Sequence, residues 1–586
     1  MALVLRRRVL RVSGPPTVVP SSQIPLGEGT LTETPDVSGA FPRLEPAQLE
    51  RLAAQSERRP TEVGDVLITE GEPDPAFYVV LSGLVAVVES YGTPEQRVVR
   101  IHGPRRFLGE LGMLTGQVSL FTSVIVAEGE VLAVPVEKIR TIVTQDAGLG
   151  DEILRAYLIR RGLAIGQGVG FRIVGSRYSA DTLRLREFAR RNRLPHRFID
   201  LETDAEAERT VRHLGIGPRD VPLVVWGQRM LRSPSNAELA AMIGLRTGTD
   251  GDTTTCDLLV VGAGPAGLAA GVYGASEGLR TVVLDAVAAG GQAATSSRIE
   301  NYLGFPAGIS GAELAERAVI QADKFGARTE VPVSATALRR EDGHYVVQLD
   351  NGTVAVARTL VVATGARYRK LPVPGLEEFE ETSVFYAATQ IEAQICDHDP
   401  VVVVGGGNSA GQATLFLAGH AAKVRLVVRE NTLDEFMSRY LADRILADPR
   451  IEVLVHTEVR ELLGDRGMLE AVVVEDTSTG RRRRLEAREL MVFIGATPCT
   501  AWLADAVELD SGGYIRTGAA VVERAADVFA ELGRAPLPLE TSAPGVFAAG
   551  DVRSGSVQRV ASAVGEGAMA VRLVHEHLSG VRTAGV

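Results

Sequence analysis

Cysteine is scarce in this sequence. Only three cysteines occur among 586 residues, at Cys256, Cys396 and Cys499, and no two of them lie close together. A disulfide scaffold needs several paired cysteines, and a cysteine zinc site needs them at short spacing. Both are therefore excluded, and we predict no metal site.

The sequence also lacks long apolar runs and an excess of positive charge. No stretch is apolar enough over sufficient length to span a bilayer, and the opening MALVLRRRVLRVSGPPTVVP lacks the unbroken apolar core of a signal peptide. The formal net charge is -11, whereas binding to nucleic acid needs a concentrated basic surface. We therefore expect a cytoplasmic protein whose main partners are neither membranes nor nucleic acids.

The chain is longer than one hydrophobic core usually supports, so several domains are expected. Residues 1–41 are rich in Pro, Ser, Gly and Thr and predict a disordered arm. In residues 42–165, β-type runs such as AFYVVLSG and LVAVVESYG precede a helical stretch, which predicts a β-barrel or roll with a helical end. Residues 168–246 alternate strand and helix patterns and predict a small α/β unit. The stretch RTGTDGDTTT after it has the composition of a linker.

The rest of the chain alternates strands and helices and carries the motifs for chemistry. In CDLLVVGAGPAGLAAGVYGASEGLRTVVLDA, an apolar strand runs into Gly262-x-Gly264-x-x-Gly267, a helix follows, and a second strand closes on Asp285. The glycines permit a tight turn and let a pyrophosphate approach the helix start, while the acid suits ribose hydroxyls. This motif predicts a dinucleotide site.

A second copy of the pattern is VVVVGGGNSAGQATLFLAGHAAKVRLVVRE, with Gly405, Gly407 and Ala410 at its turn. Its second strand ends on Arg429, and no acid precedes that residue. An arginine at this position suits the 2′-phosphate of NADPH. Arg439 is either a second phosphate ligand or an exposed helix arginine. The second motif therefore predicts an NADPH site.

A third motif lies near the end, where APGVFAAGDV brings an apolar strand into Gly550-Asp551 before a helix of small residues. An aspartate at a strand end beside a helix start can hold the ribityl and pyrophosphate region of a flavin. We therefore expect this motif and the first glycine turn to form one flavin site together.

In this order, GAGPAG, GGQAATSSRIENYLGFP, VVATGA, VVVVGGGNSAG and GVFAAGDV resemble the thioredoxin reductase type of FAD- and NADPH-dependent oxidoreductase. The resemblance covers about 255–586. It implies an α/β fold of two Rossmann-like dinucleotide-binding domains, in which the NADPH domain, 371–494, is inserted between two halves of the FAD domain, 255–370 and 495–586. It also implies a homodimer and hydride transfer from NADPH to the flavin.

The same resemblance implies which residues contact the two cofactors. For FAD they are Gly262, Gly264, Ala266, Gly267, Asp285, Gly291, Gln292, Asn301, Thr364, Gly550, Asp551, Arg559, Val560 and Ala561. With the two arginines named above, the NADPH set is Gly405, Gly407, Asn408, Ser409, Ala410, Arg429 and Arg439.

The family's Cys-Ala-Thr-Cys relay is the feature that this sequence lacks. The matching residues are Ala387-Ala388-Thr389-Gln390, so Ala387 and Gln390 replace the two redox cysteines. Disulfide exchange requires a thiolate, which neither alanine nor glutamine provides. Cys396 and Cys499 are weak substitutes, because a lone cysteine is more typical of a small buried hydrophobe.

The predicted function is therefore transfer of electrons from NADPH through FAD to an unidentified acceptor. Candidates are a quinone or other small organic molecule, dioxygen, a ferredoxin-like protein, or an external disulfide. Two alternatives stay open. One is a regulatory sensor in which flavin and NADPH report redox state with little turnover. The other is a thioredoxin-disulfide reductase that uses Cys396 or Cys499.

The segment 42–165 resembles a cyclic-nucleotide-binding domain through GDVLITEGEPDPAFYVVLSGLVAVV and FLGELGMLTGQVSLFTSVIV. Gly109 and Glu110 match the phosphate cassette, in which the acid holds the ribose hydroxyl. The cassette's arginine, however, aligns with Leu120. Without that bidentate cation a cyclic phosphate loses its main contact, so the resemblance predicts the fold rather than binding of cAMP or cGMP.

The small α/β unit resembles a thioredoxin or glutaredoxin fold. DVPLVVW places Pro222 where that family has its cis-proline, and GSRYSAD places Ser176 and Ser179 where it has Cys-x-x-Cys. The redox function is absent, so we expect a structural or docking role for this module.

Overall fold

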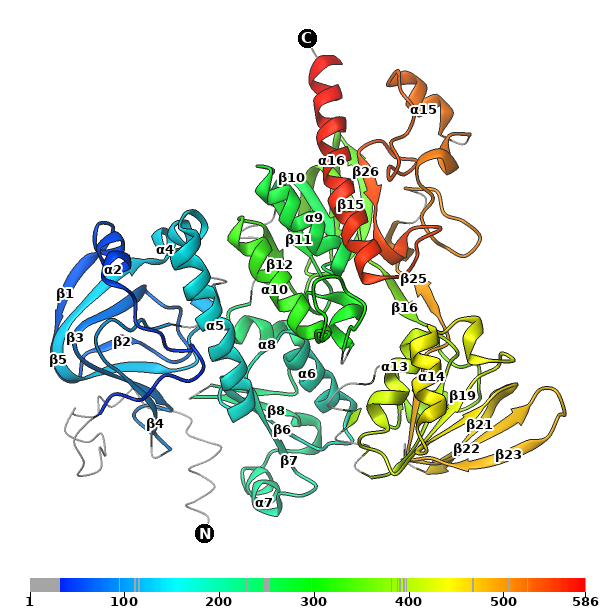
Figure 1. Cartoon of the computed structure of the whole chain (residues 1–586), viewed down its shortest axis with the longest axis horizontal. Helices are drawn as coiled ribbons and strands as arrows, with labels where there is room; N and C mark the ends of the chain where they lie inside the picture. The colour runs from blue at the N-terminus through cyan, green and yellow to red at the C-terminus, as the bar shows by residue number, and fades with distance from the viewer. Residues whose placement is uncertain are drawn as a thin grey trace. The chain divides into compact units, whose positions relative to one another are not determined.

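The computed structural model describes residues 32–584 apart from a few positions. Those positions are 94, 110, 111, 114, 115, 228, 246–252, 297, 381, 387, 389–391, 394, 395, 397, 466, 467, 504, 505 and 524. Most of the predicted disordered arm, and the predicted site residues Glu110, Ala387 and Gln390, lie outside the described residues. The chain forms two compact units, Met1–Thr247 with Asp323–Phe325, and Gly248–Ala322 with Gly326–Val586 (Figure 1).

The first unit starts with a five-stranded antiparallel sheet. Its strands in spatial order are β1 (Glu57–Thr61), β5 (Thr122–Pro135), β3 (Ala76–Glu89) and β4 (Arg97–His102), and β2 (Val66–Ile68) pairs with β5. The long pair β3 and β5 bends where the register shifts beside Gly83, whose φ of +80° favours glycine. Three helices flank the sheet, α2 (Pro46–Ala53), α4 (Val136–Gln145) and α5 (Ala147–Gln167). The predicted β-roll with a helical end is confirmed.

A small α/β sheet completes the first unit, in the order β7 (His196–Asp200), β6 (Phe171–Gly175), β8 (Leu223–Trp226) and β9 (Arg229–Arg232). β6 and β7 are parallel, whereas β8 and β9 run antiparallel. The helices are α6 (Ala180–Arg191), α7 (Ala205–His213) and α8 (Asn236–Met242), with the short helix η2 (Pro218–Asp220). The Val221–Pro222 bond is cis. The likeness of this sheet to thioredoxin stays a prediction.

The second unit contains a seven-stranded sheet built from distant parts of the chain. Its order is β12 (Arg328–Glu330), β11 (Thr281–Leu284), β10 (Thr253–Val261), β15 (Val354–Val362), β14 (His344–Leu349) and β13 (Ala335–Glu341), and β26 (Val546–Ala548) pairs with β15. The pairs among β12, β11, β10, β15 and β26 are parallel. Helices α9 (Pro265–Ser276), α10 (Gly311–Lys324) and α16 (Val560–Ala584) belong to this part. Because β26 pairs with β15, segments that flank a long insertion share one sheet (Figure 1).

The insertion forms a second parallel sheet, in the order β17 (Val384–Phe385), β24 (Glu489–Val492), β18 (Pro400–Val404), β19 (Lys423–Val427) and β20 (Ile451–Leu454). Helices α11 (Leu376–Phe379), α13 (Asn408–Leu417) and α14 (Arg439–Ala447) accompany it, and β21 (Thr457–Asp465), β22 (Met468–Asp476) and β23 (Arg482–Glu486) form an antiparallel layer. The antiparallel pair β16 (Ala366–Tyr368) and β25 (Ala496–Pro498) carries the chain into and out of the insertion. Two dinucleotide-binding folds, one inserted in the other, confirm the predicted fold class.

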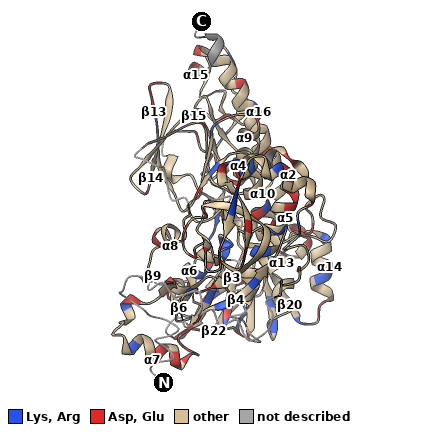
Figure 2. Ribbon diagram, turned by 90° about the vertical axis from the view of Figure 1, so that its left-hand side faces the viewer, with Lys and Arg blue, Asp and Glu red and all other residues tan. Residues whose placement is uncertain are grey.

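Charged residues occur on helices of both units (Figure 2). Among the helices that the structure describes, none is long and apolar enough to cross a membrane.

Candidate functional site: two glycine turns at parallel strand ends

The first glycine turn joins β10 to α9, and two of its glycines are required by the fold itself. Gly262 has a φ of +105°, and a Cβ there would lie 2.2 Å from the backbone oxygen of Ala363. A Cβ on Gly267 would lie 1.7 Å from the backbone oxygen of Gly262. Any side chain at either position would therefore break the turn.

Gly264 is different, because neither its backbone nor its packing demands glycine. It is the N-cap of α9 with an ordinary φ of -70°, and the nearest atom to a Cβ there is the Cα of Gly291 at 3.9 Å. No side chain caps the start of α9, and the N–H groups of an uncapped first turn are the donors that a pyrophosphate needs. Gly264 therefore fits a cofactor whose pyrophosphate approaches the backbone closely.

Asp285 follows β11 and organises this turn. Its Oδ2 accepts the N–H of Ala263 at 2.9 Å, and its Oδ1 accepts those of Val287 and Ala288 at 2.9 and 3.0 Å. A carboxylate has about four lone-pair directions, so capacity for a ribose hydroxyl remains. Asp285 stays a predicted ribose ligand, and the structure adds its role in holding the glycine turn.

The third motif lies against the first. Gly550 has a φ of +75°, and a Cβ there would lie 3.0 Å from the Cβ of Ala266 on α9. The N–H of Gly550 donates to Glu566 Oε2 at 2.7 Å, and Glu566 also pairs with Arg553. Burial, and next the nearby Glu566, raise the pKa of Asp551. Glu566 lies on α16, in the helix that follows Gly550-Asp551, and sequence reasoning gave it no role.

The other predicted FAD residues lie around these turns to different degrees. Thr364 lies just after β15, and its hydroxyl donates to the backbone oxygen of Cys499 at 2.8 Å. Gln292 lies in the short helix η3 (Gly291–Thr295). Asn301 is exposed in the loop before α10, and Arg559, Val560 and Ala561 surround the start of α16.

In the second glycine turn, between β18 and α13, one glycine is again required by the fold and another is not. Gly405 has a φ of +143°, and a Cβ there would lie 2.3 Å from the backbone oxygen of Phe493. Gly407 is the N-cap of α13 with a φ of -97°, and a Cβ there would meet no atom within 4 Å. Ala410 is fully buried and Ser409 is exposed. The open helix start at Gly407 again fits a pyrophosphate.

Two of the predicted NADPH residues have partners inside the protein. Asn408 Oδ1 accepts the backbone N–H of Ser438 at 2.6 Å, which ties the start of α13 to the start of α14. Arg439, the first residue of α14, has a side chain that is 89% exposed and lies 3.9 Å from Asp443. Its position matches the alternative of an exposed helix arginine.

Arg429 is paired with an acid that sequence reasoning missed. Its Nε donates to Glu430 Oε1 at 2.7 Å, and its side chain is 75% exposed, whereas that of Glu430 is 13% exposed. A Cβ on Gly406 would lie 2.7 Å from Glu430 Oε2, so this carboxylate lies over the glycine turn. The sequence does carry a signal for this acid, because Glu430 directly follows Arg429.

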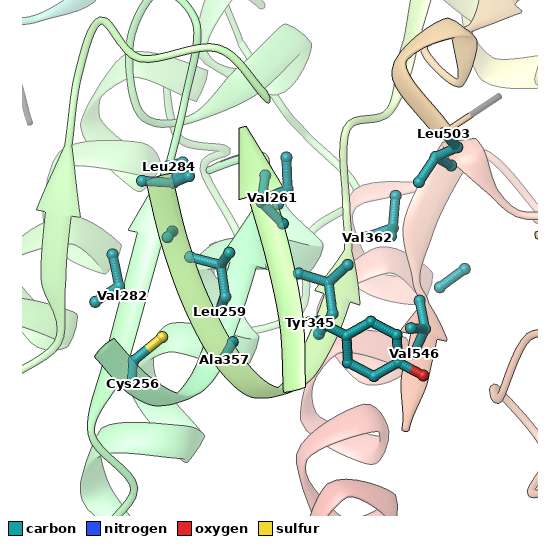
Figure 3. Packing of buried hydrophobic residues seen from close by; sticks show 14 of the residues in the cluster. Cys256, Leu259, Val261, Val282, Leu284, Tyr345, Ala357, Val362, Leu503 and Val546 are labelled. Atoms are coloured by element: carbon teal, nitrogen blue, oxygen red, sulfur yellow. The ribbon is translucent and has the colours of Figure 1, made fainter. Parts of the chain in front are cut away.

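None of the three cysteines is an activated thiol. Cys256 lies among aliphatic side chains of the sheet core (Figure 3), and burial raises its pKa to about 12. Cys396 is fully buried, and burial followed by the negative charge of Glu489 raises its pKa further. Burial also raises the pKa of Cys499. All three are free thiols, and at neutral pH each is protonated and a poor nucleophile.

The β-roll contains a hollow of about 90 Å³, partly open to solvent, lined by residues that include Phe41, Arg100, His102, Ser119 and Arg160. Its two arginines, Arg100 and Arg160, come from β4 and α5. Arg160 donates to three backbone oxygens, those of Ala40, Phe107 and Gly109. A φ of +94° at Gly109 fits the predicted cassette glycine.

In the small α/β unit, both serines have structural partners. Ser179 caps α6 by accepting the N–H of Thr182, and the Ser176 hydroxyl donates to Glu202. These serines use their side chains to hold the turn before α6, and a structural or docking role for the module stays a prediction.

Comparison with known proteins covers both units. The family model described as pyridine nucleotide-disulphide oxidoreductase matches residues 256–567, and that of the cyclic nucleotide-binding domain matches residues 58–146. A thioredoxin reductase of Treponema pallidum is 35% identical over 326 residues, which cover 56% of this chain and 98% of that protein. A 34.2 kDa protein in the rubredoxin operon of Clostridium pasteurianum is 30% identical, over 55% of this chain and 97% of its own length. The crystal structure of T. acidophilum thioredoxin reductase aligns with a TM-score of 0.50 at 28% identity, covering 55% of this chain and 98% of that one.

Proposed function

The chain belongs to the pyridine nucleotide-disulphide oxidoreductase family as an FAD-dependent NAD(P)H oxidoreductase, and we propose that its electron acceptor takes electrons at the flavin without a cysteine relay. The family's cofactors are FAD and NADPH. The substrate on the reducing side is then NADPH, and the acceptor is a quinone or other small organic molecule, dioxygen, a ferredoxin-like protein or an external disulfide.

The observation that carries this proposal is the state of the cysteines. Ala387 and Gln390 occupy the relay positions in the sequence. Of the cysteines that remain, Cys396 is fully buried, and burial raises the pKa of both Cys256 and Cys499. A disulfide relay needs two thiols that approach each other and ionise, and this chain offers no such pair at neutral pH.

The residues that would hold the cofactors follow from the two turns. The open N-terminus of α9 at Gly264, with Asp285 and Asp551 beside it, would hold the FAD pyrophosphate, ribose and ribityl groups. The N-terminus of α13 at Gly407 would hold the nicotinamide dinucleotide. Bound FAD supplies two-electron chemistry, in which a hydride enters from NADPH and two electrons leave to the acceptor. The protein's task is therefore to orient the two nucleotides and to admit the acceptor.

An anaerobic titration of the flavin-loaded protein with dithionite tests the proposal. We expect about two electrons per FAD, because flavin is then the only redox centre. The Cys396→Ser/Cys499→Ser double variant should take up the same number. Uptake of about four electrons by the native protein, falling to two in the double variant, would show a hidden disulfide. It would favour the alternative of a disulfide reductase that acts on thioredoxin-like substrates.

The hollow in the β-roll favours a second candidate function, that of a sensor. In that case flavin and NADPH report redox state, and the β-roll binds a regulatory ligand or partner. Steady-state NADPH oxidation separates the two functions. An enzyme turns over with at least one acceptor from a panel of menadione, dioxygen, ferredoxin and an aromatic disulfide, whereas a sensor reduces its flavin once and stays slow with all of them.

We also propose, from the family resemblance, that the chain acts as a homodimer. Light scattering on the flavin-loaded protein measures this directly, and a monomer mass at working concentration would contradict it.

A further inference from the structure

We propose that Glu430 and Arg429 together form a selectivity pair that admits NADH alongside NADPH at the second glycine turn. This inference rests on the proposed function, since it concerns the nucleotide that delivers the hydride. It adds a donor, NADH, and names the two side chains that set the preference.

The position of Glu430 carries the argument. It follows β19, the second strand of the nucleotide-binding fold, where the adenosine ribose of a bound dinucleotide lies. Its backbone oxygen accepts the N–H of His456 at 3.1 Å, which fixes the residue. Its Oε2 would lie 2.7 Å from a Cβ on Gly406, so the carboxylate contacts the glycine turn where the ribose edge meets the pyrophosphate.

The chemistry of a carboxylate at this point favours a free ribose diol. A carboxylate accepts hydrogen bonds from the 2′- and 3′-hydroxyls, which NADH offers. The 2′-phosphate of NADPH brings a second negative charge close to Glu430 and replaces a donor with acceptors. Glu430 alone would therefore favour NADH.

Arg429 favours NADPH, but its guanidinium is already bonded to Glu430. Its guanidinium suits a phosphate, yet its Nε is bonded to Glu430 Oε1 at 2.7 Å. The next acids along the chain, Asp434 and Glu435, are exposed and add negative charge to this loop. The 2′-phosphate of NADPH must compete with Glu430 for Arg429. The ribose hydroxyls of NADH can donate to Glu430 without breaking its bond to Arg429. Because these two effects oppose each other, NADPH and NADH should bind with similar affinity.

The test is the ratio of kcat/KM for flavin reduction by NADPH to that by NADH, in the flavin-loaded protein. We expect a ratio within about tenfold of one, or about 1.4 kcal/mol. Glu430→Ala should move the ratio at least tenfold toward NADPH, and Arg429→Ala at least tenfold toward NADH. Asp434→Asn removes one charge from the same loop and serves as the matched control, with a change below about threefold.

Binding of NADP⁺ and NAD⁺ to the oxidised flavoprotein, measured by calorimetry, gives the same ratio without turnover. If both bind with the expected ratio but neither reduced form reduces the flavin, the proposed function fails while the selectivity pair stands. A native preference for NADP⁺ above about 100-fold that Glu430→Ala leaves unchanged would overturn the pair. Failure of both nucleotides to bind would overturn it as well.

Discussion

Thr364 and Cys499 join the two chain crossings of the second unit. The Thr364 hydroxyl donates to the backbone oxygen of Cys499 at 2.8 Å, and the Cys499 N–H donates to the oxygen of Gly365 at 3.0 Å. Thr364 follows β15, where the chain leaves the seven-stranded sheet, and Cys499 follows β25, where it returns. These bonds therefore fix the exit and the return of the insertion beside each other, next to the first glycine turn.

Replacing Thr364 with valine should destabilise this junction. The change keeps the shape of the side chain but removes the donor to a partly buried carbonyl, at a cost of about 1 kcal/mol. We expect the unfolding midpoint of the apo-protein to fall by about 1–2 °C in a calorimetric scan. Thr364→Ser keeps the hydroxyl and should stay near the native value. Equal midpoints for valine and native protein would mean that the bond contributes nothing.

Substitutions at the glycines should separate folding from cofactor binding. Gly264→Ala and Gly407→Ala meet no protein atom closer than 3.9 Å, so both variants should unfold near the native temperature. The added methyl groups fill the space that a pyrophosphate needs, so Gly264→Ala should lose FAD and Gly407→Ala should bind NADP⁺ at least tenfold more weakly.

Gly262→Ala is the matched contrast, because its φ of +105° and the 2.2 Å approach to Ala363 oppose any side chain. It should lower the unfolding midpoint even without cofactor. Absorbance of bound flavin, calorimetric titration and thermal unfolding measure the three effects. Normal flavin content in Gly264→Ala would remove this glycine from the site.

The sequence predicts the two turns well because their requirements are local. Gly262 and Gly405 need positive φ values and bare Cα atoms, and these needs are visible in a short motif. Glu566 and the pairing of β26 with β15 were beyond such reasoning. β15 and β26 are far apart in the sequence, so their pairing depends on the tertiary fold. Glu566 lies 16 residues after Gly550, and its contact depends on side-chain direction on α16, which a motif does not record.

The comparisons support the predicted NADPH cofactor, and the structure adds Glu430, a side chain at this turn to which the sequence pattern gave no role. Selectivity depends on which side chain faces the turn, and here the neighbouring Glu430 lies over Gly406 while Arg429 points to solvent. Side-chain direction after a strand end depends on tertiary contacts, which a motif does not record.

Arg534→Met should strongly destabilise the segment that leads into β26. Arg534 pairs with the fully buried Glu540 through two bonds of 2.6 and 2.7 Å. Burial alone would raise the pKa of Glu540, but Arg534, then His577 and the backbone N–H groups of Leu537 and Gly545, hold it at about 2. Removing the arginine takes away the main cation of a buried carboxylate that keeps only His577 and two backbone N–H groups, at a cost of up to about 3–5 kcal/mol.

The same pair predicts a pH dependence. The folded pKa of Glu540 lies below its ordinary value of 4.5, so its stabilisation is present above that pH and is lost as pH falls toward 2. Urea unfolding across pH 2–7 measures both effects, and Arg534→Met should flatten the acid limb of the curve. An unchanged acid limb would contradict the role assigned to Glu540.

Glu489→Gln should stabilise the insertion at alkaline pH. Glu489 begins β24, is 5% exposed, and has one carboxylate oxygen that is buried without a hydrogen bond. Burial, and then the charge of Asp399, raise its pKa to about 8. A raised folded pKa means that its contribution to stability is complete below the ordinary value of 4.5 and is lost as pH rises through 8.

Glutamine has the same shape and no charge, so the variant should unfold at a higher temperature than the native protein at pH 9 and at nearly the same temperature at pH 5. Thermal unfolding at the two pH values gives the difference. Glu486→Gln, on the exposed strand β23, removes a charge of the same kind and should change neither value. An equal gain at both pH values would mean that packing, and not the ionisation of a buried carboxyl, limits stability here.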